Sequence, residues 1–248
     1  MIILDRKTKK GNDLYNYDIS NYIGGFCYVV DGATPLFNDK IFSNTSDLYE
    51  YMQLLKRNLK NIGIIEENFI KAIKKSNLII NNIEMYSEYE LPTFTIASVK
   101  EENDKYYLYV LCDSLISILY KNGDIKNIYD NRFDKFKKRW SNKIEEINKL
   151  NISENEKNRM KLPIWKEYRK YANKKDGYPV GSTNFNSIKN GILTSVLKDD
   201  IDSILICTDG FYNAFGLPNE KWYFNKEILS DKMKHINYHG DITYILLK

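Results

Sequence analysis

The sequence predicts a layered α+β domain, and two observations support this class. Short runs rich in Val, Ile, Leu, Tyr and Cys predict strands, and these runs form two groups with helical patterns between them. Groups of strands and helices arranged in this way are typical of α+β architectures. The chain has 248 residues, 43% of them hydrophobic, and no linker rich in Pro, Gly or Ser divides it. We therefore expect a single domain over residues 1–248.

The first part of the chain predicts strands followed by two helices. One run is continuously apolar, as expected of a strand buried on both faces, and shorter runs precede it. Beyond it, apolar residues recur at three- and four-residue spacing, which predicts amphipathic helices, and Thr45 or Ser46 fits an N-cap. The expected elements are strands over 2–4, 14–19 and 24–31 and helices over 46–60 and 66–85.

The remainder predicts an antiparallel meander, a helix-rich segment and a final group of strands. Asn122-Gly123-Asp124 is typical of a hairpin turn between two strands. Residues 132–173 are charged, have apolar side chains at helical spacing and contain a capping-box pattern at Ser153-Glu154-Asn155-Glu156. The expected strands are 93–99, 105–111, 117–120, 125–129, 191–197, 201–208 and 243–247.

Composition excludes several classes of function. The formal charge of +4 arises from 37 basic and 33 acidic residues, so it indicates no nucleic-acid partner, and we interpret the basic run at 135–139 as a solvated helix face. No apolar stretch is long enough for a bilayer, and the N-terminus does not have the pattern of a secretory signal. We expect a cytoplasmic protein without a membrane partner. Cys27, Cys112 and Cys207 are expected to be reduced core residues.

Three apolar runs end in an aspartate followed by a small residue. These aspartates are Asp31, Asp113 and Asp209. Taken singly, each is compatible with ordinary turn chemistry, in which Asp bonds the backbone that follows it. A carboxylate at the end of a buried strand is costly to desolvate, and a cation, an ion pair or several hydrogen bonds offset that cost. The repetition therefore predicts a shared cation, and oxygen ligands favour Mg²⁺ or Mn²⁺.

A carboxylate-held cation site indicates a reaction class. Two divalent cations about 3.5 to 4 Å apart polarise a phosphoryl group and lower the pKa of water between them. The chain has no Gly-x-Ser-x-Gly elbow and no Cys-x5-Arg phosphate loop, which disfavours catalysis by a nucleophilic serine or cysteine. It also has no Gly-x4-Gly-Lys run, which disfavours nucleotide triphosphate hydrolysis by a P-loop. The sequence therefore predicts metal-assisted phosphoester hydrolysis.

Five short motifs, in this order, resemble those of the metal-dependent serine/threonine protein phosphatases of type 2C. They are Asn12-Asp13, Val30-Asp31-Gly32, Cys112-Asp113-Ser114, Thr208-Asp209-Gly210 and Gly240-Asp241-Ile242-Thr243. The resemblance covers almost the whole chain. It implies a four-layer α/β/β/α sandwich, two antiparallel sheets flanked by helices, with a dinuclear Mn²⁺ or Mg²⁺ site at one end. Residues 129–180 would form the family's variable flap.

The resemblance also implies roles for individual residues. Asp31 would bridge two cations, the Gly32 carbonyl would bind one of them and Asp209 the other. Asp113 matches the position associated with a third, weaker cation. Asp13 matches a carboxylate that orients the attacking water, so Asp13, Asp31 and Asp209 are the expected catalytic residues. The substrate would be a phosphorylated protein.

Two departures from the family pattern concern the phosphate and the leaving group. A histidine that commonly follows the first Asp-Gly is absent, because Ala33 and Thr34 come next, so the general acid is unassigned. The basic residue that binds phosphate usually lies five positions before the residue matching Asp13, and that position is Thr8. Residues expected to substitute for it are Arg6, Lys9 or Lys10.

A third departure lies in the C-terminal motif. Aligned on Thr243, the family's ligand position is Gly240, and Asp241 stands one residue later. A shift of one residue, made sterically easy by Gly240, would let Asp241 bind a cation, and this is the expected arrangement. The three departures support an alternative function, in which the fold is a binding or regulatory module with a weakened metal site. The sequence makes no prediction of the oligomeric state.

Overall fold

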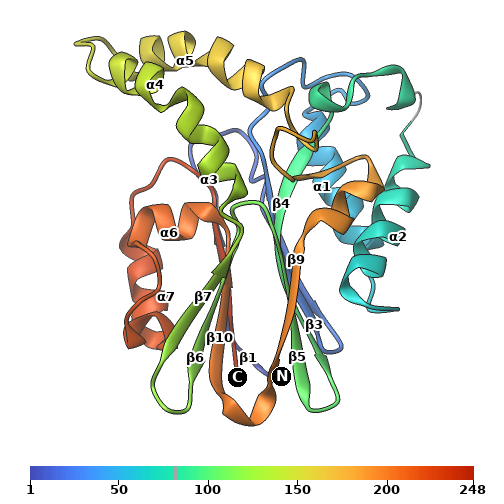
Figure 1. Cartoon of the computed structure of the whole chain (residues 1–248), viewed down its shortest axis with the longest axis vertical. Coiled ribbons are helices and arrows are strands. Elements are labelled where there is room, and N and C mark those ends of the chain that lie inside the picture. Colours follow the sequence, from blue (N-terminus) through green and yellow to red (C-terminus); the bar gives the residue numbers. More distant parts are fainter. Residues whose placement is uncertain (81–82) are drawn as a thin grey trace.

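The computed structural model describes residues 1–80 and 83–248. Within these residues the strands form two antiparallel sheets packed face to face, and helices cover the outer face of each sheet (Figure 1). The predicted α+β sandwich with its α/β/β/α layers is confirmed.

Sheet A contains the first and last strands of the chain. All its neighbouring strands are antiparallel, and the Ile2 N–H donates to the Lys248 carbonyl at 2.6 Å, which holds the two chain ends side by side (Figure 1). In spatial order its strands are β1 (Ile3–Lys9), β11 (Ile242–Leu247), β10 (Ile201–Cys207), β6 (Leu115–Tyr120) and β7 (Ile125–Tyr129).

Sheet B contains the remaining strands and is also antiparallel throughout its described pairs. Because β4 runs against both of its neighbours, β3 and β5 point in the same direction and end at the same edge. In spatial order the strands are β2 (Ile19–Ile23), β3 (Phe26–Gly32), β4 (Thr93–Glu102), β5 (Lys105–Leu111) and β9 (Ile192–Leu197), and β8 (Gly181–Ser182) pairs with β4.

Side chains of β3 point alternately to its two faces, so this one strand contributes to two hydrophobic clusters. Cys27 and Val29 are fully buried against sheet A, in the cluster that fills the space between the sheets. Phe26, Tyr28 and Val30 are fully buried against the helices, since successive side chains of a strand point to opposite faces. A strand buried on both sides has no polar face, which explains its continuous apolar run.

Helices complete the outer layers and one end of the sandwich. α1 (Asp47–Asn58) and α2 (Ile65–Asn77) cover sheet B, and α6 (Asp209–Phe215) and α7 (Lys226–His235) cover sheet A (Figure 1). The predicted N-cap Ser46 accepts the Tyr49 N–H at 3.2 Å. A helical segment lies across one end of both sheets in Figure 1, and we call residues 129–180 the flap. Its helices are α3 (Arg132–Lys137), α4 (Ser141–Asn148) and α5 (Glu154–Arg169).

Two predicted elements differ from the structure. The helix expected over 66–85 ends at Asn77, Leu78 beyond it is 86% exposed, and 83–85 form a separate 3₁₀ turn, while 81–82 lie outside the described residues. The strand expected over 14–19 is a loop up to Asp18, because side chains take its backbone donors. The Tyr17 N–H donates to Asp241 and the Asp18 N–H to Asn16 Oδ1.

Two expectations about the chain as a whole can be compared with the structure. The thiols of Cys27, Cys112 and Cys207 are buried and unpaired, as predicted. None of the helices in the described part of the chain combines the length and the apolar character needed to cross a bilayer.

Candidate metal centre and active site

Asp31 lies at the end of β3, on the face that points toward sheet A. It shares this face with Cys27 and Val29 because all three occupy alternate positions of the strand. Ile19 of β2 pairs with Val30, and continuing this register places Asp18 beside Asp31. No sequence pattern predicts a role for Asp18, because no apolar run leads to it. Only the strand register brings it to the site.

Thr208 and Asp209 follow β10 of sheet A and lie near Asp18 and Asp31. The Thr208 hydroxyl donates to Asp18 Oδ2 at 3.1 Å and accepts the Thr243 N–H at 3.1 Å, which links the ends of β10 and β11 to the start of β2. Asp209 follows as the first residue of α6, and it lines the same cleft as Asp31. The structure therefore brings Asp31 and Asp209 to one place.

Asp113 lies near Asp31 and Asp209, and an unusual backbone conformation precedes it. Cys112, which precedes it, has a φ of +63°, in the left-handed region that residues other than glycine adopt at an energetic cost. This conformation turns the chain at the end of β5. The Asp113 carbonyl is then fixed by the Tyr212 hydroxyl of α6, which donates to it at 2.7 Å.

Asp31, Asp113 and Asp209 border one cleft of about 180 Å³ at the flap end of the sandwich. The carboxylates are half-buried, and the walls come from both sheets and from the flap. The lining residues are Asp31, Gly32, Ala33, Thr34, Thr95, Cys112, Asp113, Phe133, Tyr178, Val180 and Asp209.

The electrostatics of the cleft are those of acidic groups crowded together. Burial, followed by the charges of Asp18 and Asp209, raises the pKa of Asp31 well above its usual range. Burial and the charge of Asp209 raise the pKa of Asp113 to about 7, and burial raises that of Asp18 to about 7. Like charges and desolvation both disfavour ionisation, so a bound cation would relieve both.

The donor chemistry fits hard divalent cations. The converging groups are all oxygen donors, and Asp18 Oδ1 is buried without a hydrogen-bond partner within the described residues. Among residues 1–80 and 83–248, no three His, Cys, Asp or Glu side chains form a ready metal-binding group.

Gly32 and Thr95 shape the floor of the cleft. A Cβ on Gly32 would lie 3.0 Å from the Tyr17 carbonyl oxygen, so the backbone of β3 packs directly on the loop before β2. Thr95 pairs with Asp31 across β3 and β4, and its hydroxyl is hydrogen-bonded to Ser114 at 2.6 Å. These contacts fix the positions of Asp31 and of the Gly32 carbonyl.

The structure does not place Asp241 among the clustered carboxylates as a ligand. One of its carboxylate oxygens accepts the Gly11 N–H at 2.8 Å, and the other accepts the Tyr17 N–H at 2.6 Å. The side chain thereby fastens the loop between β1 and β2. The expected shift of Asp241 into a cation site is not supported, because backbone donors already hold both oxygens.

Asp13 is also absent from the cleft. Its side chain is exposed on the same loop, and its carbonyl oxygen accepts the Lys10 ammonium at 2.6 Å. Asp18 is the loop carboxylate that faces Asp31. The expected role of Asp13 in orienting water is not supported, since the loop fastened by Asp241 leaves Asp13 exposed and outside the cleft lining.

The three basic residues expected to bind phosphate are engaged elsewhere. Arg6 donates to Asn21 Oδ1 at 3.3 Å, Lys9 to the Ile236 carbonyl at 2.5 Å and Lys10 to the Asp13 carbonyl. None of the three lines the carboxylate cleft.

Tyr238 occupies the space beside Gly240. A Cβ on Gly240 would lie 2.9 Å from Tyr238 Cε1, so a larger residue there requires the ring to move. Burial and the charges of Asp209 and Asp31 raise the pKa of Tyr238. Tyr238 therefore lies where a side chain from position 240 would approach the site.

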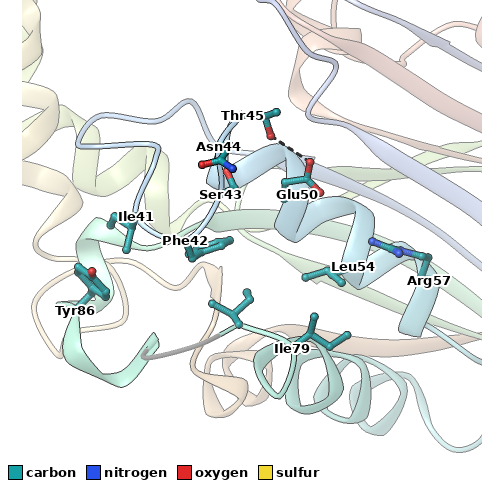
Figure 2. Close-up of a pocket in the computed structure, with 11 residues that line it drawn as sticks. Ile41, Phe42, Ser43, Asn44, Thr45, Glu50, Leu54, Arg57, Ile79 and Tyr86 are labelled. Atoms are coloured by element: carbon teal, nitrogen blue, oxygen red, sulfur yellow. Dashed lines mark hydrogen bonds between the residues drawn. The ribbon is translucent and has the colours of Figure 1, made fainter.

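A larger cavity is separate from this cleft. It has a volume of about 590 Å³ and lies between the 41–45 loop, α1 and residues near Ile79 and Tyr86 (Figure 2). Its walls include Phe42, Leu54 and Arg57, and none of the predicted site residues lines it.

Comparisons with known proteins bear on the fold. No protein-family model and no curated protein matches the sequence. Solved structures do match: the serine/threonine phosphatase Stp1 from Staphylococcus aureus is 12% identical, with 100% of this chain and 95% of that chain covered and a TM-score of 0.59.

Two further structures give the same result. The S. agalactiae serine/threonine phosphatase is 15% identical, covering 98% of this chain and 97% of that chain, with a TM-score of 0.59. The catalytic domain of the serine/threonine protein phosphatase PstP, in complex with two manganese ions, is 14% identical, covering 98% and 95%, with a TM-score of 0.58. The chain therefore has the fold of the type 2C serine/threonine phosphatases, as the motif resemblance implied.

Proposed function

We propose that this protein is a metal-dependent phosphatase that hydrolyses phosphoserine and phosphothreonine on proteins. The observation that carries the proposal is the convergence of Asp31, Asp113 and Asp209, from both sheets, on one cleft. The similarity in fold to serine/threonine phosphatases, one of them holding two manganese ions, supports the same reaction class.

Bound Mn²⁺ or Mg²⁺ would supply positive charge to polarise the phosphoryl group and to lower the pKa of the attacking water. Asp31, the Gly32 carbonyl, Asp113 and Asp209 would hold two or three such ions. Asp18 replaces Asp13 in our proposal, because Asp18 contacts Asp31 and its Oδ1 has no partner in the described residues. An oxygen in that state is suited to accept a proton or to orient water.

The residues around the carboxylates have supporting roles. Thr208 keeps Asp18 oriented through its hydroxyl, and Asn213 donates to Asp209 Oδ2 at 3.1 Å. The flap, through Phe133 and Tyr178, forms the wall opposite the sheets. We infer that a phosphorylated side chain enters between this wall and the carboxylates.

Hydrolysis of para-nitrophenyl phosphate and of a phosphothreonine peptide, with and without Mn²⁺, tests the proposal. Turnover should require the metal and stop with EDTA, and Asp209→Asn should reduce it at least about a hundredfold, as loss of a charged group at a metal site does. Asp231→Asn is the matched control, because Asp231 is 71% exposed on α7. Folded wild-type protein with no metal-dependent turnover would refute the proposal.

A second candidate function is a binding or regulatory module with a weakened metal site. It is favoured by Gly240, which offers no side chain, and by Asp241, whose oxygens are already hydrogen-bonded. Calorimetric titration with Mn²⁺ separates the two candidates. Uptake by wild-type protein that is lost in Asp31→Asn supports the enzyme, whereas equal, negligible uptake by both supports the module.

A further inference from the structure

One basic side chain of the flap stands beside the carboxylate cleft. The Lys137 ammonium lies 2.9 Å from Asp134 Oδ1 and 4.4 Å from the centre of the Phe133 ring. Phe133 itself lines the cleft together with Asp113 and Asp209. The C-terminal end of α3 therefore presents a cation at the flap wall of the site.

The carboxylates and this cation influence one another. Burial lowers the pKa of Lys137, but the hydrogen bond to Asp134 and the charges of Asp113 and Asp209 raise it above its ordinary value. Lys137 in turn opposes the upward shift in the pKa of Asp113. The ammonium group is thus within electrostatic reach of two of the clustered carboxylates.

Two neighbouring arginines of the flap are committed to other partners. Arg132 forms a paired hydrogen bond with the buried Asp130, at 2.6 and 2.8 Å, and Arg139 donates to the Asp176 carbonyl. Among residues 1–80 and 83–248, the ion-pair partner of Lys137 is Asp134, whose side chain is 54% exposed. An exposed ion pair contributes at most about 1 kcal/mol, so a doubly charged ligand can displace it.

We propose that Lys137 binds the phosphoryl group of the substrate. Arg6, Lys9 or Lys10 was expected to have this role. This inference rests on the proposed phosphatase function. A phosphate dianion in a cleft of carboxylates needs positive charge beside it, and the Lys137 ammonium carries such a charge on the flap. The long, flexible stem of lysine lets the ammonium turn from Asp134 to the phosphate.

Calorimetric binding of inorganic phosphate in the presence of Mn²⁺ tests the inference. Lys137→Ala should weaken phosphate binding about tenfold, as loss of one hydrogen bond between charged groups does. Lys137→Arg should retain most of the affinity. Lys135→Ala is the matched control, because Lys135 is exposed on the same helix, and it should stay within twofold of wild type.

Kinetics with para-nitrophenyl phosphate give a second readout. In Lys137→Ala, the KM for para-nitrophenyl phosphate and the inhibition constant of phosphate should both rise about tenfold. The Mn²⁺ affinity should stay equal or increase, because a positive charge near the carboxylates has been removed. A merely structural role would weaken metal and phosphate binding together.

The outcomes separate this inference from the proposed function. Wild-type turnover with unchanged phosphate binding in Lys137→Ala overturns the role of Lys137 and leaves the phosphatase intact. Phosphate binding that depends on Lys137 without any turnover refutes the phosphatase and keeps the anion site. Wild-type protein that binds no phosphate with Mn²⁺ present overturns the inference directly.

Discussion

Asp209 and Asp31 line the same cleft, although the two residues belong to opposite sides of the sandwich. Asp31 ends a strand of sheet B, and Asp209 follows a strand of sheet A. Two acids held this close, with Asp18 and Asp113 beside them, make the cleft unfavourable without compensating charge. The following predictions depend on this relationship.

Stability without metal should fall as the pH rises. The pKa values of Asp18 and Asp113 are raised to about 7, so between about pH 4 and pH 7 the folded protein holds protons that the unfolded chain has lost. The free energy of unfolding should decrease across this interval and level off above it. Urea unfolding in EDTA at pH 5, 6, 7 and 8 measures the decrease, and Asp113→Asn should make it shallower. Parallel curves for the two proteins would contradict the prediction.

Asp18→Asn should change stability and metal affinity in opposite directions. Removing a buried charge from the cluster should raise the melting temperature in EDTA at pH 8 by roughly 3 °C, the shift that about 1 kcal/mol produces in a domain of this size. Mn²⁺ affinity should fall about tenfold or more, because Asp18 lies beside Asp31, the proposed ligand. Thermal unfolding and calorimetry give the two values. Asp13→Asn is the control and should change neither.

Mn²⁺ should stabilise the folded protein in proportion to its binding. At a concentration a hundred times the dissociation constant, binding to the folded state alone adds about 2.7 kcal/mol. Thermal unfolding with increasing Mn²⁺ should show the melting temperature rising in wild type and remaining flat in Asp31→Asn. A rise of the same size in the variant would place the ion elsewhere.

Asp241→Ala should affect the loop between β1 and β2 more than the metal. The change removes the acceptors of the Gly11 and Tyr17 N–H groups, at a cost of about 1 to 3 kcal/mol for each donor left buried and unpaired. Unfolding should occur at lower urea, while Mn²⁺ affinity measured on the folded protein stays within about threefold. A much larger loss of affinity without loss of stability would restore Asp241 as a ligand.

Gly240→Asp combined with Tyr238→Ala should strengthen metal binding. Alone, Gly240→Asp meets the Tyr238 ring at 2.9 Å and should destabilise the protein. With the ring removed, the new carboxylate has room beside Asp209, and Mn²⁺ affinity should exceed that of wild type about tenfold. Calorimetry on both single variants and the double variant provides the test, and an unchanged affinity in the double variant would count against a ligand position at 240.

The sequence predicts best where the pattern is continuous. The run before Asp31 is apolar at every position because β3 is buried on both faces, so both the strand and the aspartate that ends it are evident. The same reasoning finds Asp113 and Asp209. The apolar periodicity after Glu66 was a poorer guide, because Leu78 and Ile79 continue it but are exposed in the structure.

Residues placed by tertiary contacts escape this reasoning. Asp18 is positioned by the pairing of Ile19 with Val30, and nothing local distinguishes it from Asp13 on the same loop. Asp241 is held by backbone donors of residues far away in the sequence. Lys137 belongs to a basic run that is exposed elsewhere, and only the packing of α3 against the cleft sets it apart.

The flap has an apolar cluster of its own, separate from the clusters between and outside the sheets. Phe136, Tyr168 and Tyr178 form its centre, and Cys112 joins it to the end of β5. Substitutions on the outer surface of the flap should therefore leave the packing between the sheets unchanged. The flap wall of the cleft and the strands that end at the carboxylates are stabilised by separate sets of side chains, so each can be altered on its own.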